Sequence, residues 1–576
     1  MCLLAYMIKF IIGFLLIAFL VTGSLAAEEK TSKLNQSFHS RADLSDRNLS
    51  GLDLSGADLN QSELQGSDLR GTNLSRSFLM YSIISNAKLI GANLSGAFMP
   101  AVDLHSSDLS NADLRGAFLP VNLLIYANLT GTDLSGSTMD QSMADNSTLV
   151  GAKLNGASLW AVKISYANLI GASLVKAFMN RATFQNSQLN GANLPEASLV
   201  GTNLINATIS NADLSGADVS ESRCSGANFS GSKLIKSTLG FTNLTSTNLS
   251  MADLSGSYLV ASRLDNSDLT KANLSGANLE NAFMNRVRLV GAKLSGASLP
   301  GVRLEDSDLS NCDLENADLT GALLGGCNLT GANLTGARLL GTDLSLAIIK
   351  DTDLNGATLL GAKMNWADLS DSSLINCQFT RAELFGANLS NSDLTGSDLT
   401  RAYLVRVNLS GCNLKGVILD YADLTSANLR NAKLGNIRLA NVFLNNADLS
   451  GADLDGATFY SLNLNGTSMS RASLRAARLE IFNLDGVDLS GADLRNTKMI
   501  RGAMSKVNLS GSDLRGANLT VVLMDADLRG ANLEGIKYDP LTLQFLAGSD
   551  LEGARISADL RNDLERMRKE NGVSPS

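Results

Sequence analysis

Two stretches 20 residues apart, SGAFMPAVDL (residues 95–104) and RGAFLPVNLL (residues 115–124), share the order Ala, Phe, apolar residue, Pro. Around them the chain follows a shorter period of five residues. From Leu44 to Leu519, every residue whose number ends in 4 or 9 is a repeat centre, and 94 of these 96 centres hold Leu, Ile, Met, Phe or Val. The two exceptions are Ala144 and Cys224. A period of five fits neither an α-helix nor a simple β-strand.

The composition of each five-residue unit suggests how it folds. Two residues before the centre the chain mostly holds Ala, Ser or Thr, one residue before it holds Asp or Asn, and the numbers ending in 1 or 6 are rich in Gly and Asn. In extended chain the small residue and the centre point to the same side. Gly and Asn tolerate the positive φ of a tight corner. Such a chain buries its inward residues only by stacking coil on coil, which predicts a β-solenoid.

The aromatic residues indicate how many units form one coil. Phe78, Phe98, Phe118 and Phe178 differ by multiples of 20, so four units per coil would stack them in one column. When residue numbers are divided by 20, 21 of the 22 aromatic residues between 44 and 519 leave a remainder of 18, 19 or 0 to 6, and Phe229 is the exception. We therefore predict an all-β, four-sided β-helix of about 24 coils, roughly 115 Å long at ~4.8 Å per coil.

The repeat unit resembles a known family. The stretches GADLN around Ala57, GANLS around Ala92 and NADLS around Ala212 resemble the A-[DN]-L-x-x consensus of the pentapeptide-repeat family, and the resemblance covers residues 42–536. It implies a right-handed, four-sided β-helix. Members of this family do not share one activity, so the fold alone leaves the function open.

The N-terminus has the features of an export signal. Lys9 precedes an apolar run at residues 10–21, and small residues stand at the −3 and −1 positions of a cleavage site after Ala26. We predict a signal peptide at residues 1–26 and a linker at residues 27–41. The apolar run is short for a membrane span, although retention as an anchor stays open. The mature chain would then have no membrane span, a net charge of about −10 and a periplasmic or extracellular location if the source is bacterial.

The repeat changes near its C-terminal end. Met524 is in phase, but Leu528 and Leu533 come one residue early, which predicts a deletion or distortion within residues 520–528. After residue 536 the repeat fades.

Two helices are expected in residues 537–576. Asp539 and Pro540 mark a helix start, Gly548 marks its end, and Ser557 is a candidate N-cap for a second helix. The second helix has an apolar stripe of Leu560, Leu564 and Met567. We interpret the segment as a helical cap, because an open solenoid end exposes strand edges. A dimerisation element is the alternative.

The sequence contains few candidates for a catalytic or ligand-binding site. Only two His residues occur, His39 and His105, and no catalytic, metal-binding or phosphate-binding motif stands in a supporting context. We predict no enzyme activity and no catalytic, cofactor or metal site. Unrelated β-helices that cleave polysaccharides are the one enzymatic analogy. No basic block indicates direct nucleic-acid binding. Five cysteines occupy inward positions and are expected to be small buried residues: Cys224, Cys312, Cys327, Cys377 and Cys412.

The four predicted sides differ in their outward residues. The sides at remainders 8 and 13 carry 18 acidic and six basic residues, a balance of −12, and we call them the back. The sides at remainders 3 and 18 carry ten acidic and nine basic residues, and with the corners at remainders 0, 1, 5 and 6 they form the front. The front is rich in aromatic residues, which are typical anchors of partner surfaces. The candidate partner-binding residues are Phe78, Tyr81, Phe98, Phe118, Tyr126, Trp160, Tyr166, Phe178, Trp366, Tyr403, Tyr421 and Phe443.

These features lead to two hypotheses about function. The first is an exported, non-catalytic rod whose aromatic front binds a protein, a cell-surface polymer or a second copy of the chain. The second follows family members that inhibit DNA gyrase by presenting a DNA-like acidic rod, for which the back would serve. Packing of aromatic residues along their own columns is the structural alternative for the front.

Overall fold

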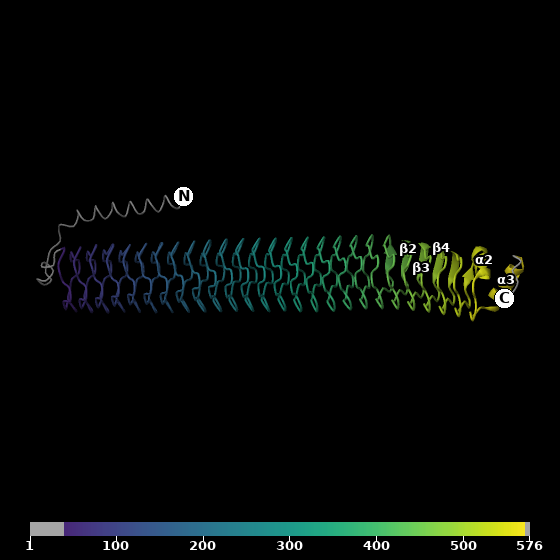
Figure 1. Ribbon diagram of the computed structural model, residues 1–576, viewed down its shortest axis with the longest axis horizontal. Helices are drawn as coiled ribbons and strands as arrows, with labels where there is room; N and C mark the ends of the chain where they lie inside the picture. The colour runs from purple at the N-terminus through teal and green to yellow at the C-terminus, as the bar shows by residue number, and fades with distance from the viewer. Residues whose placement is uncertain (1–39, 571–576) are drawn as a thin grey trace.

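The described chain is a straight rod. The computed structural model describes residues 40–570, and the coils follow one another along one axis (Figure 1). The predicted signal peptide and all but the last two residues of the predicted linker lie outside the described residues. Parallel bridges join residues 20 apart, such as Phe78 to Phe98 and Phe98 to Phe118, and each coil has one bridge on each of four sides. The predicted right-handed, four-sided β-helix is confirmed.

The core follows the five-residue period. The repeat centres and the small residues two positions earlier are buried, and even the atypical centres Ala144 and Cys224 are 0% exposed. Four inward Phe residues, at 184, 229, 379 and 459, are also fully buried. The corners have positive φ, as at Asn86 (57°) and Gly96 (64°), so the predicted role of Asn and Gly is confirmed.

Hydrogen bonds between coils hold the rod together. The backbone N–H of Phe98 donates to the carbonyl of Ser77 at 2.8 Å, and the N–H of Leu79 donates to the carbonyl of Phe98 at 2.8 Å. The outward Asp and Asn residues bind the corner that follows them. Asp53 Oδ1, for example, accepts a hydrogen bond from the N–H of Ser55 at 3.1 Å. These side chains therefore form Asx turns, which explains their fixed place in the repeat.

The last coils have longer strands that form one parallel sheet on the front. In residues 458–463 and 478–483 the strand continues through the corner between two sides of the rod. The large residues just after this corner, Leu462 and Phe482, point into the core. Phe482 is 5% exposed, and Gly502 in the next coil leaves room for its ring, since a Cβ there would lie 2.2 Å from it. The six strands pair in chain order: β1 (Arg438–Ala440), β2 (Thr458–Asn463), β3 (Arg478–Asn483), β4 (Lys498–Ala503), β5 (Asn518–Val522) and β6 (Lys537–Tyr538).

The predicted break in register lies between β4 and β5. Ile500 pairs with Thr520, whereas Gly502 pairs with Val521, so one residue is missing opposite Arg501. The prediction of a deletion or distortion within residues 520–528 is confirmed.

The two predicted helices cover the C-terminal end. Helix α2 is Pro540–Gly548 and helix α3 is Ala558–Glu570. Asp539 caps α2 by accepting a hydrogen bond from the N–H of Thr542 at 2.7 Å. The Thr542 hydroxyl satisfies the edge of β5, because it accepts from the N–H of Val521 at 3.1 Å and donates to its carbonyl at 3.0 Å.

Helix α3 packs on its own chain. Leu560 and Leu564 of the predicted apolar stripe are buried, and Met567 packs against the same core. Tyr538 donates its hydroxyl to Asp563 at 2.7 Å, which ties α3 to the last strand. The stripe is thus covered within the chain, which favours the cap over the dimerisation element.

Coil stacking continues beyond residue 536, where we predict that the five-residue repeat ends. Asp527 pairs with Asp550, and Asn532 pairs with Arg555. Each pair is 23 residues apart because α2 is inserted into the last coil. The repeat fades in sequence at residue 536, but coil stacking continues on the back to Arg555.

The ladder of hydrogen bonds is interrupted once on the front. Within the described chain, no backbone hydrogen bond joins residues 416–421 to residues 435–440. One coil earlier the equivalent bonds are present, such as the N–H of Leu399 to the carbonyl of Ile418 at 2.8 Å. On the other sides pairing continues across this coil, for example from Asp423 to Phe443. The coil is therefore held on three sides only.

This interruption predicts a local difference in hydrogen exchange. The amides of Leu419, Tyr421 and Arg438 should exchange at least ~10-fold faster than those of Leu399 and Arg401, because local opening needs less free energy where the bonds are missing. Hydrogen–deuterium exchange of peptides covering residues 416–421 and 396–401 measures this directly. Equal protection of the two peptides would show that the ladder is continuous in solution.

Candidate partner-binding surface

The predicted partner-binding residues all lie on the surface of the front, but their exposure differs. Most of them are exposed to solvent: Phe78, Tyr81, Tyr126, Tyr166, Trp366, Tyr403, Tyr421 and Phe443. The others are half-buried: Phe98, Phe118, Trp160 and Phe178. Between residues 44 and 519 the chain has 23 exposed large apolar residues, and 19 of them lie on the front. Exposed apolar surface is therefore concentrated on the predicted side of the rod.

The aromatic residues of the front do not form one continuous strip. Its aromatic residues form two main groups. The N-terminal aromatic cluster consists of Phe78, Tyr81, Phe98, Phe118 and Tyr126, and the C-terminal aromatic cluster consists of Trp366, Phe385, Tyr403, Tyr421 and Phe443. Between the two clusters, aromatic residues of the front alternate with charged residues. Phe283, for example, has the guanidinium groups of Arg263 and Arg303 at 5.8 and 5.0 Å from its ring centre.

The N-terminal aromatic cluster is partly packed on itself. The rings of Phe98 and Phe118 stack with centroids 5.3 Å apart and planes 7° apart. Phe78 is tilted against Phe98 at 6.3 Å. Column packing therefore accounts for the middle of this cluster, while Tyr81 and Tyr126 at its corners remain exposed.

The C-terminal aromatic cluster keeps more of its surface free. Trp366 meets Phe385 edge-on at 5.2 Å, and Phe385 stacks on Tyr403 at 6.1 Å. The Trp366 ring lies over Gly386 of the next coil, where a Cβ would come within 2.6 Å of it. Even so, Trp366 is 56% exposed. This cluster is therefore ordered by its own contacts and still open to a partner.

Arginine residues accompany the C-terminal aromatic cluster. The guanidinium of Arg401 lies 5.7 Å from the Tyr421 ring centre, and that of Arg406 lies 5.9 Å from the Phe385 ring centre. Together with Arg381, these side chains form no ion pair with any residue in the described part of the chain. These arginines are not among the binding residues predicted from the sequence. Their position at corner numbers ending in 1 and 6, beside the aromatic residues of the front, is a signal that could have identified them.

A shallow groove runs along the corner beside this cluster. It has a volume of about 480 Å³ and is lined by Leu340 and Leu360 at one end and by Tyr421 at the other. Arg381 and Arg401 lie between them. Apolar and cationic groups thus alternate along the rod axis, which suits a partner that offers both apolar and acidic groups.

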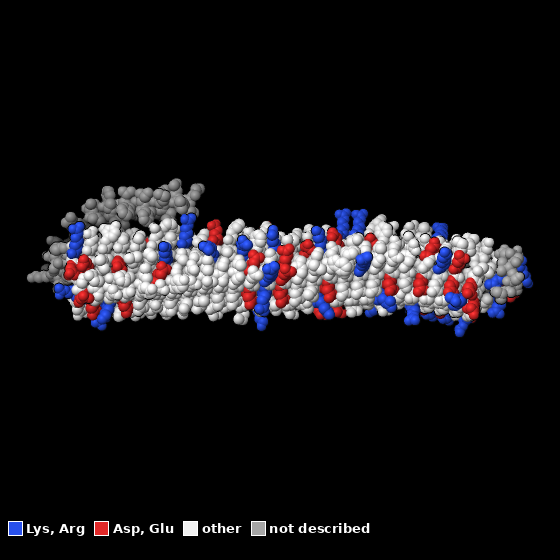
Figure 2. All heavy atoms as spheres, viewed as in Figure 1, with Lys and Arg blue, Asp and Glu red and all other residues white. Residues whose placement is uncertain are grey.

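The back is less acidic than its two sides suggest. Its corners, at remainders 10, 11, 15 and 16, carry 13 basic and five acidic residues, so the balance of −12 falls to −4. Several of these arginines pair with the Asp two residues earlier, such as Arg70 with Asp68 at 2.6 Å and Arg115 with Asp113 at 2.7 Å. Figure 2 shows basic and acidic residues interspersed along the visible side of the rod. The basic corners therefore offset most of the acidic charge on the two sides of the back.

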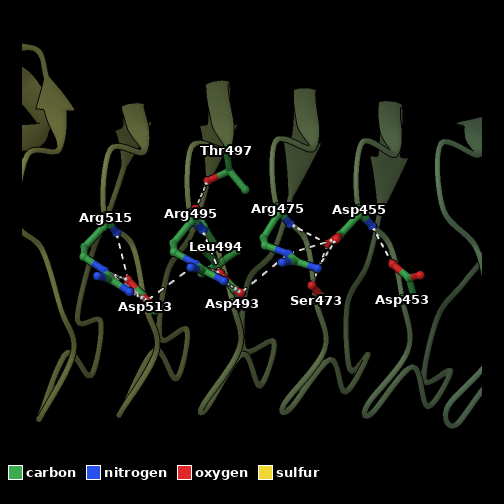
Figure 3. Close-up of polar contacts among 10 residues, drawn as sticks. All are labelled: Asp453, Asp455, Ser473, Arg475, Asp493, Leu494, Arg495, Thr497, Asp513 and Arg515. Carbon is green, nitrogen blue, oxygen red and sulfur yellow. Dashed lines mark hydrogen bonds and ion pairs between the residues drawn. The ribbon is translucent and has the colours of Figure 1, made fainter.

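The ion pairs form a ladder in the last coils (Figure 3). Arg495 binds Asp493 of its own coil at 2.6 Å and approaches Asp513 of the next coil at 3.7 Å. Arg475 approaches Asp493 in the same way at 3.7 Å. Hydrogen bonds from Arg495 and Arg515 lower the pKa values of Asp493 and Asp513, respectively. A similar bond from Arg70 lowers the pKa of Asp68 to about 2. Such carboxylates stay ionised, which makes them unsuited to act as general acids.

The remaining sequence candidates show no reactive site. The five cysteines at inward positions are free and buried, as expected, and burial raises the pKa of each thiol, that of Cys224 to about 12. In residues 40–570, no group of His, Cys, Asp and Glu is arranged to hold a metal ion. No helix in this range is long and apolar enough to cross a membrane.

The ladder predicts a pH-dependent effect of its arginines. In the variant Arg475→Gln, Arg495→Gln, Arg515→Gln, the pKa values of Asp493 and Asp513 should return toward 3.8. A carboxyl with a lowered pKa stabilises the fold above its unfolded pKa, and this stabilisation is lost as the pH falls through the folded value.

The variant should therefore be less stable than the parent at pH 7, and the difference should become smaller as the pH falls from 3.8 toward 2. Urea denaturation midpoints at pH 7 and pH 2 measure it. Arg471→Gln, which alters an arginine without an ion pair in the described chain, is the control and should match the parent. A difference that persists unchanged at pH 2 would contradict the electrostatic explanation.

Comparison with known proteins gives the chain its family. No curated protein sequence matches it. Among solved structures, HetL, a pentapeptide repeat protein involved in heterocyst differentiation regulation in the cyanobacterium Nostoc sp. strain PCC 7120, is 32% identical, covers 39% of this chain and 88% of its own, and has a TM-score of 0.27. A pentapeptide repeat protein of the Arabidopsis thaliana thylakoid lumen is 34% identical over 18% of this chain and 71% of its own, with a TM-score of 0.18.

Full-length QnrB1, a plasmid-mediated fluoroquinolone resistance protein, is 20% identical over 38% of this chain and 97% of its own, with a TM-score of 0.17. The family model for pentapeptide repeats matches 15 overlapping or adjacent segments between residues 40 and 537. With its five-residue units and four-sided coils, the chain belongs to the pentapeptide repeat family, whose members are generally non-catalytic structural or binding proteins.

Proposed function

We propose that this protein is an exported, non-catalytic rod that binds a partner through the aromatic residues of its front, chiefly through the C-terminal aromatic cluster. The partner is a protein, a cell-surface polymer or a second copy of the chain. The observation that carries the proposal is the exposure of Trp366, Tyr403 and Tyr421 on a surface that their neighbours hold in place.

Self-packing alone does not account for this cluster. Trp366 contacts Phe385 edge-on, and Arg401 lies against Tyr421, yet more than half of each aromatic residue, Trp366 and Tyr421, remains in water. Exposed Trp and Tyr next to Arg are the residue types that anchor protein interfaces. Ordering them before binding lowers the entropy that a partner must overcome.

The absence of catalysis is supported by the way the outward carboxylates are used. Asp residues at the repeat positions accept hydrogen bonds from the backbone N–H two residues later, as Asp53 does from Ser55. Such carboxylates are structural acceptors. The family's generally non-catalytic character agrees with this reading.

Export rests on the sequence of residues 1–26, which precede the described chain. Its apolar run and small residues before Ala27 have the pattern of a cleaved signal. The DNA-mimic alternative has less support, because the basic corners of the back neutralise most of the acidic charge on its sides.

Mutation of the C-terminal aromatic cluster tests the proposed binding. The variant Trp366→Ser, Tyr403→Ser, Tyr421→Ser should retain the fold, since these side chains are exposed. It should capture less of any partner, because removal of each anchor costs at least ~2 kcal/mol of binding free energy. We expect a loss of more than ~10-fold in pull-downs from the extracellular or envelope fraction of the native host, quantified by mass spectrometry.

The matched control removes exposed apolar residues from the back, as Ile90→Ser, Ile170→Ser, Met251→Ser. This variant should capture the partner as the parent does. If the two triple variants retain the same partners in the same amounts, the front is not the binding surface.

A further inference from the structure

One side of the rod and the corner that follows it change charge along the chain. The positions at remainder 18 form this side, which holds Phe78, Phe98 and Phe118, and those at remainders 0 and 1 form the corner. Between residues 58 and 321 these positions hold six acidic residues and one basic residue. Between residues 338 and 501 they hold three acidic and seven basic residues, a balance of +4 on a chain whose net charge is −9. We call this second stretch the basic ridge.

Most cations of the basic ridge lack an acidic partner. Arg478 pairs with Glu480, but the other six basic residues form no ion pair within residues 40–570. Of the two remaining acids, Asp398 accepts a hydrogen bond from the Thr380 hydroxyl at 3.2 Å, and Asp420 lies in the groove beside Tyr421. The ridge therefore keeps a positive charge after its internal pairing. Its basic residues, all exposed, are Arg338, Arg381, Arg401, Arg438, Arg478, Lys498 and Arg501.

Exposed apolar side chains alternate with these cations. Along the corner, two leucines are followed by two arginines and then by Tyr421, and strands β2, β3 and β4 continue the corner toward the C-terminal end (Figure 1). The diagonally opposite corner, at remainders 10 and 11, holds only Gly, Ser, Asn and charged residues between residues 350 and 511. The apolar residues of the ridge, 38–53% exposed, are Leu340, Leu360, Ile418, Tyr421, Tyr460 and Ile481.

We propose that the basic ridge binds the surface of a lipid bilayer that contains anionic phospholipids. The inference goes beyond the proposed partner binding, because Trp366 and Tyr403 lie on the adjacent side and its far corner. The corner of a four-sided rod projects from it, so a soft surface receives the corner without a matching groove. From Leu340 to Arg501 the ridge spans nine coils, about 40 Å at ~4.8 Å per coil, which suits an extended, flat surface.

The residue types of the ridge match the layers of such a surface. Guanidinium groups bind phosphate oxygens in a bidentate manner, and Tyr favours the boundary between water and lipid. The aliphatic side chains of Leu340, Leu360 and Ile481 reach the acyl boundary when the corner is pressed into the headgroups. A soluble anionic polymer would engage the arginines but leave these side chains in water. An anionic surface also repels the acidic stretch at residues 58–321, which confines contact to the C-terminal third of the rod.

Vesicle binding of the predicted mature chain tests the role of the charge. Residues 27–576 contain every described residue and lack the apolar run at residues 10–21, which would bind lipid by itself. We expect the chain to co-sediment with vesicles of equimolar phosphatidylcholine and phosphatidylglycerol. The variant Arg381→Gln, Arg401→Gln, Arg438→Gln should bind them at least ~30-fold more weakly, because each cation near an anionic surface contributes about a five-fold change in binding.

The matched control removes the same number of charges from the back. Lys271→Gln, Lys293→Gln, Arg471→Gln alters three basic residues that form no ion pair in the described chain. Because its net charge equals that of the ridge variant, it separates the position of the cations from their number. It should bind the vesicles as the parent does.

A tryptophan on the ridge tests whether the apolar side chains enter the interface. The chain has two Trp residues, and Trp160→Phe, Trp366→Phe removes both. In that background, vesicles should shift the emission of Tyr460→Trp to shorter wavelength and at least halve its quenching by acrylamide. Met251→Trp, on the back, should keep its emission and quenching.

Three results would overturn the proposal: no binding to the anionic vesicles, equal binding of the two triple glutamine variants, or an emission of Tyr460→Trp that vesicles leave unchanged. Soluble polygalacturonate captured through the same three arginines without vesicle binding would also overturn it and assign the ridge to an anionic polymer. Partner capture through Trp366 and Tyr403 by a chain that binds no vesicles would remove this inference and leave the proposed function in place.

Discussion

Hydrogen bonding between successive coils is the interaction on which the whole rod depends. Within a coil of 20 residues the backbone pairs only at the turns, as the N–H of Ala57 does with the carbonyl of Leu54 at 3.1 Å. The remaining N–H and C=O groups on each side must find partners in the coil above or below. The ladder through Ser77, Phe98 and Leu79 shows the pattern that the other coils repeat. It also requires the end coil to be covered, and the Thr542 hydroxyl performs this task for the edge of β5.

Stacking at a fixed spacing also determines which side chains become neighbours. Every outward residue lies beside the residue 20 positions away, so the outward residues form columns along the rod. Neighbouring side chains in one column must therefore pack together without a clash or a repulsion between like charges. On the back this compatibility comes from alternating charges, as in the ladder of Arg475, Asp493 and Arg495. On the front it comes from stacked rings and from arginines against rings. The front differs from the back in its exposed aromatic residues, such as Trp366 and Tyr421.

Sequence periodicity was sufficient to predict the coil, its four sides, the side that collects the aromatic residues and both C-terminal helices. These features depend on which way a residue points, and the five-residue unit determines that directly. The sequence did not predict the mixed stretch around Phe283, the neutralising role of corner residues such as Arg115, or the interrupted ladder at Leu419. Those features depend on side-chain reach across corners and on small shifts between coils, which residue spacing does not encode. The insertion of α2 within the last coil was missed because the helix interrupts the repeat.

The central claim is that the front aromatic residues face water in the isolated rod and become covered on association. The chain has only two Trp residues, so Trp160→Phe leaves Trp366 as the single fluorescent reporter in the C-terminal aromatic cluster. Acrylamide quenching of this Trp, measured from nanomolar to micromolar protein, tests the claim directly. We predict strong quenching in dilute protein and clearly weaker quenching as the rods associate or as an isolated partner is added. Quenching that stays the same in every associated state would contradict the assignment of the front as the binding surface.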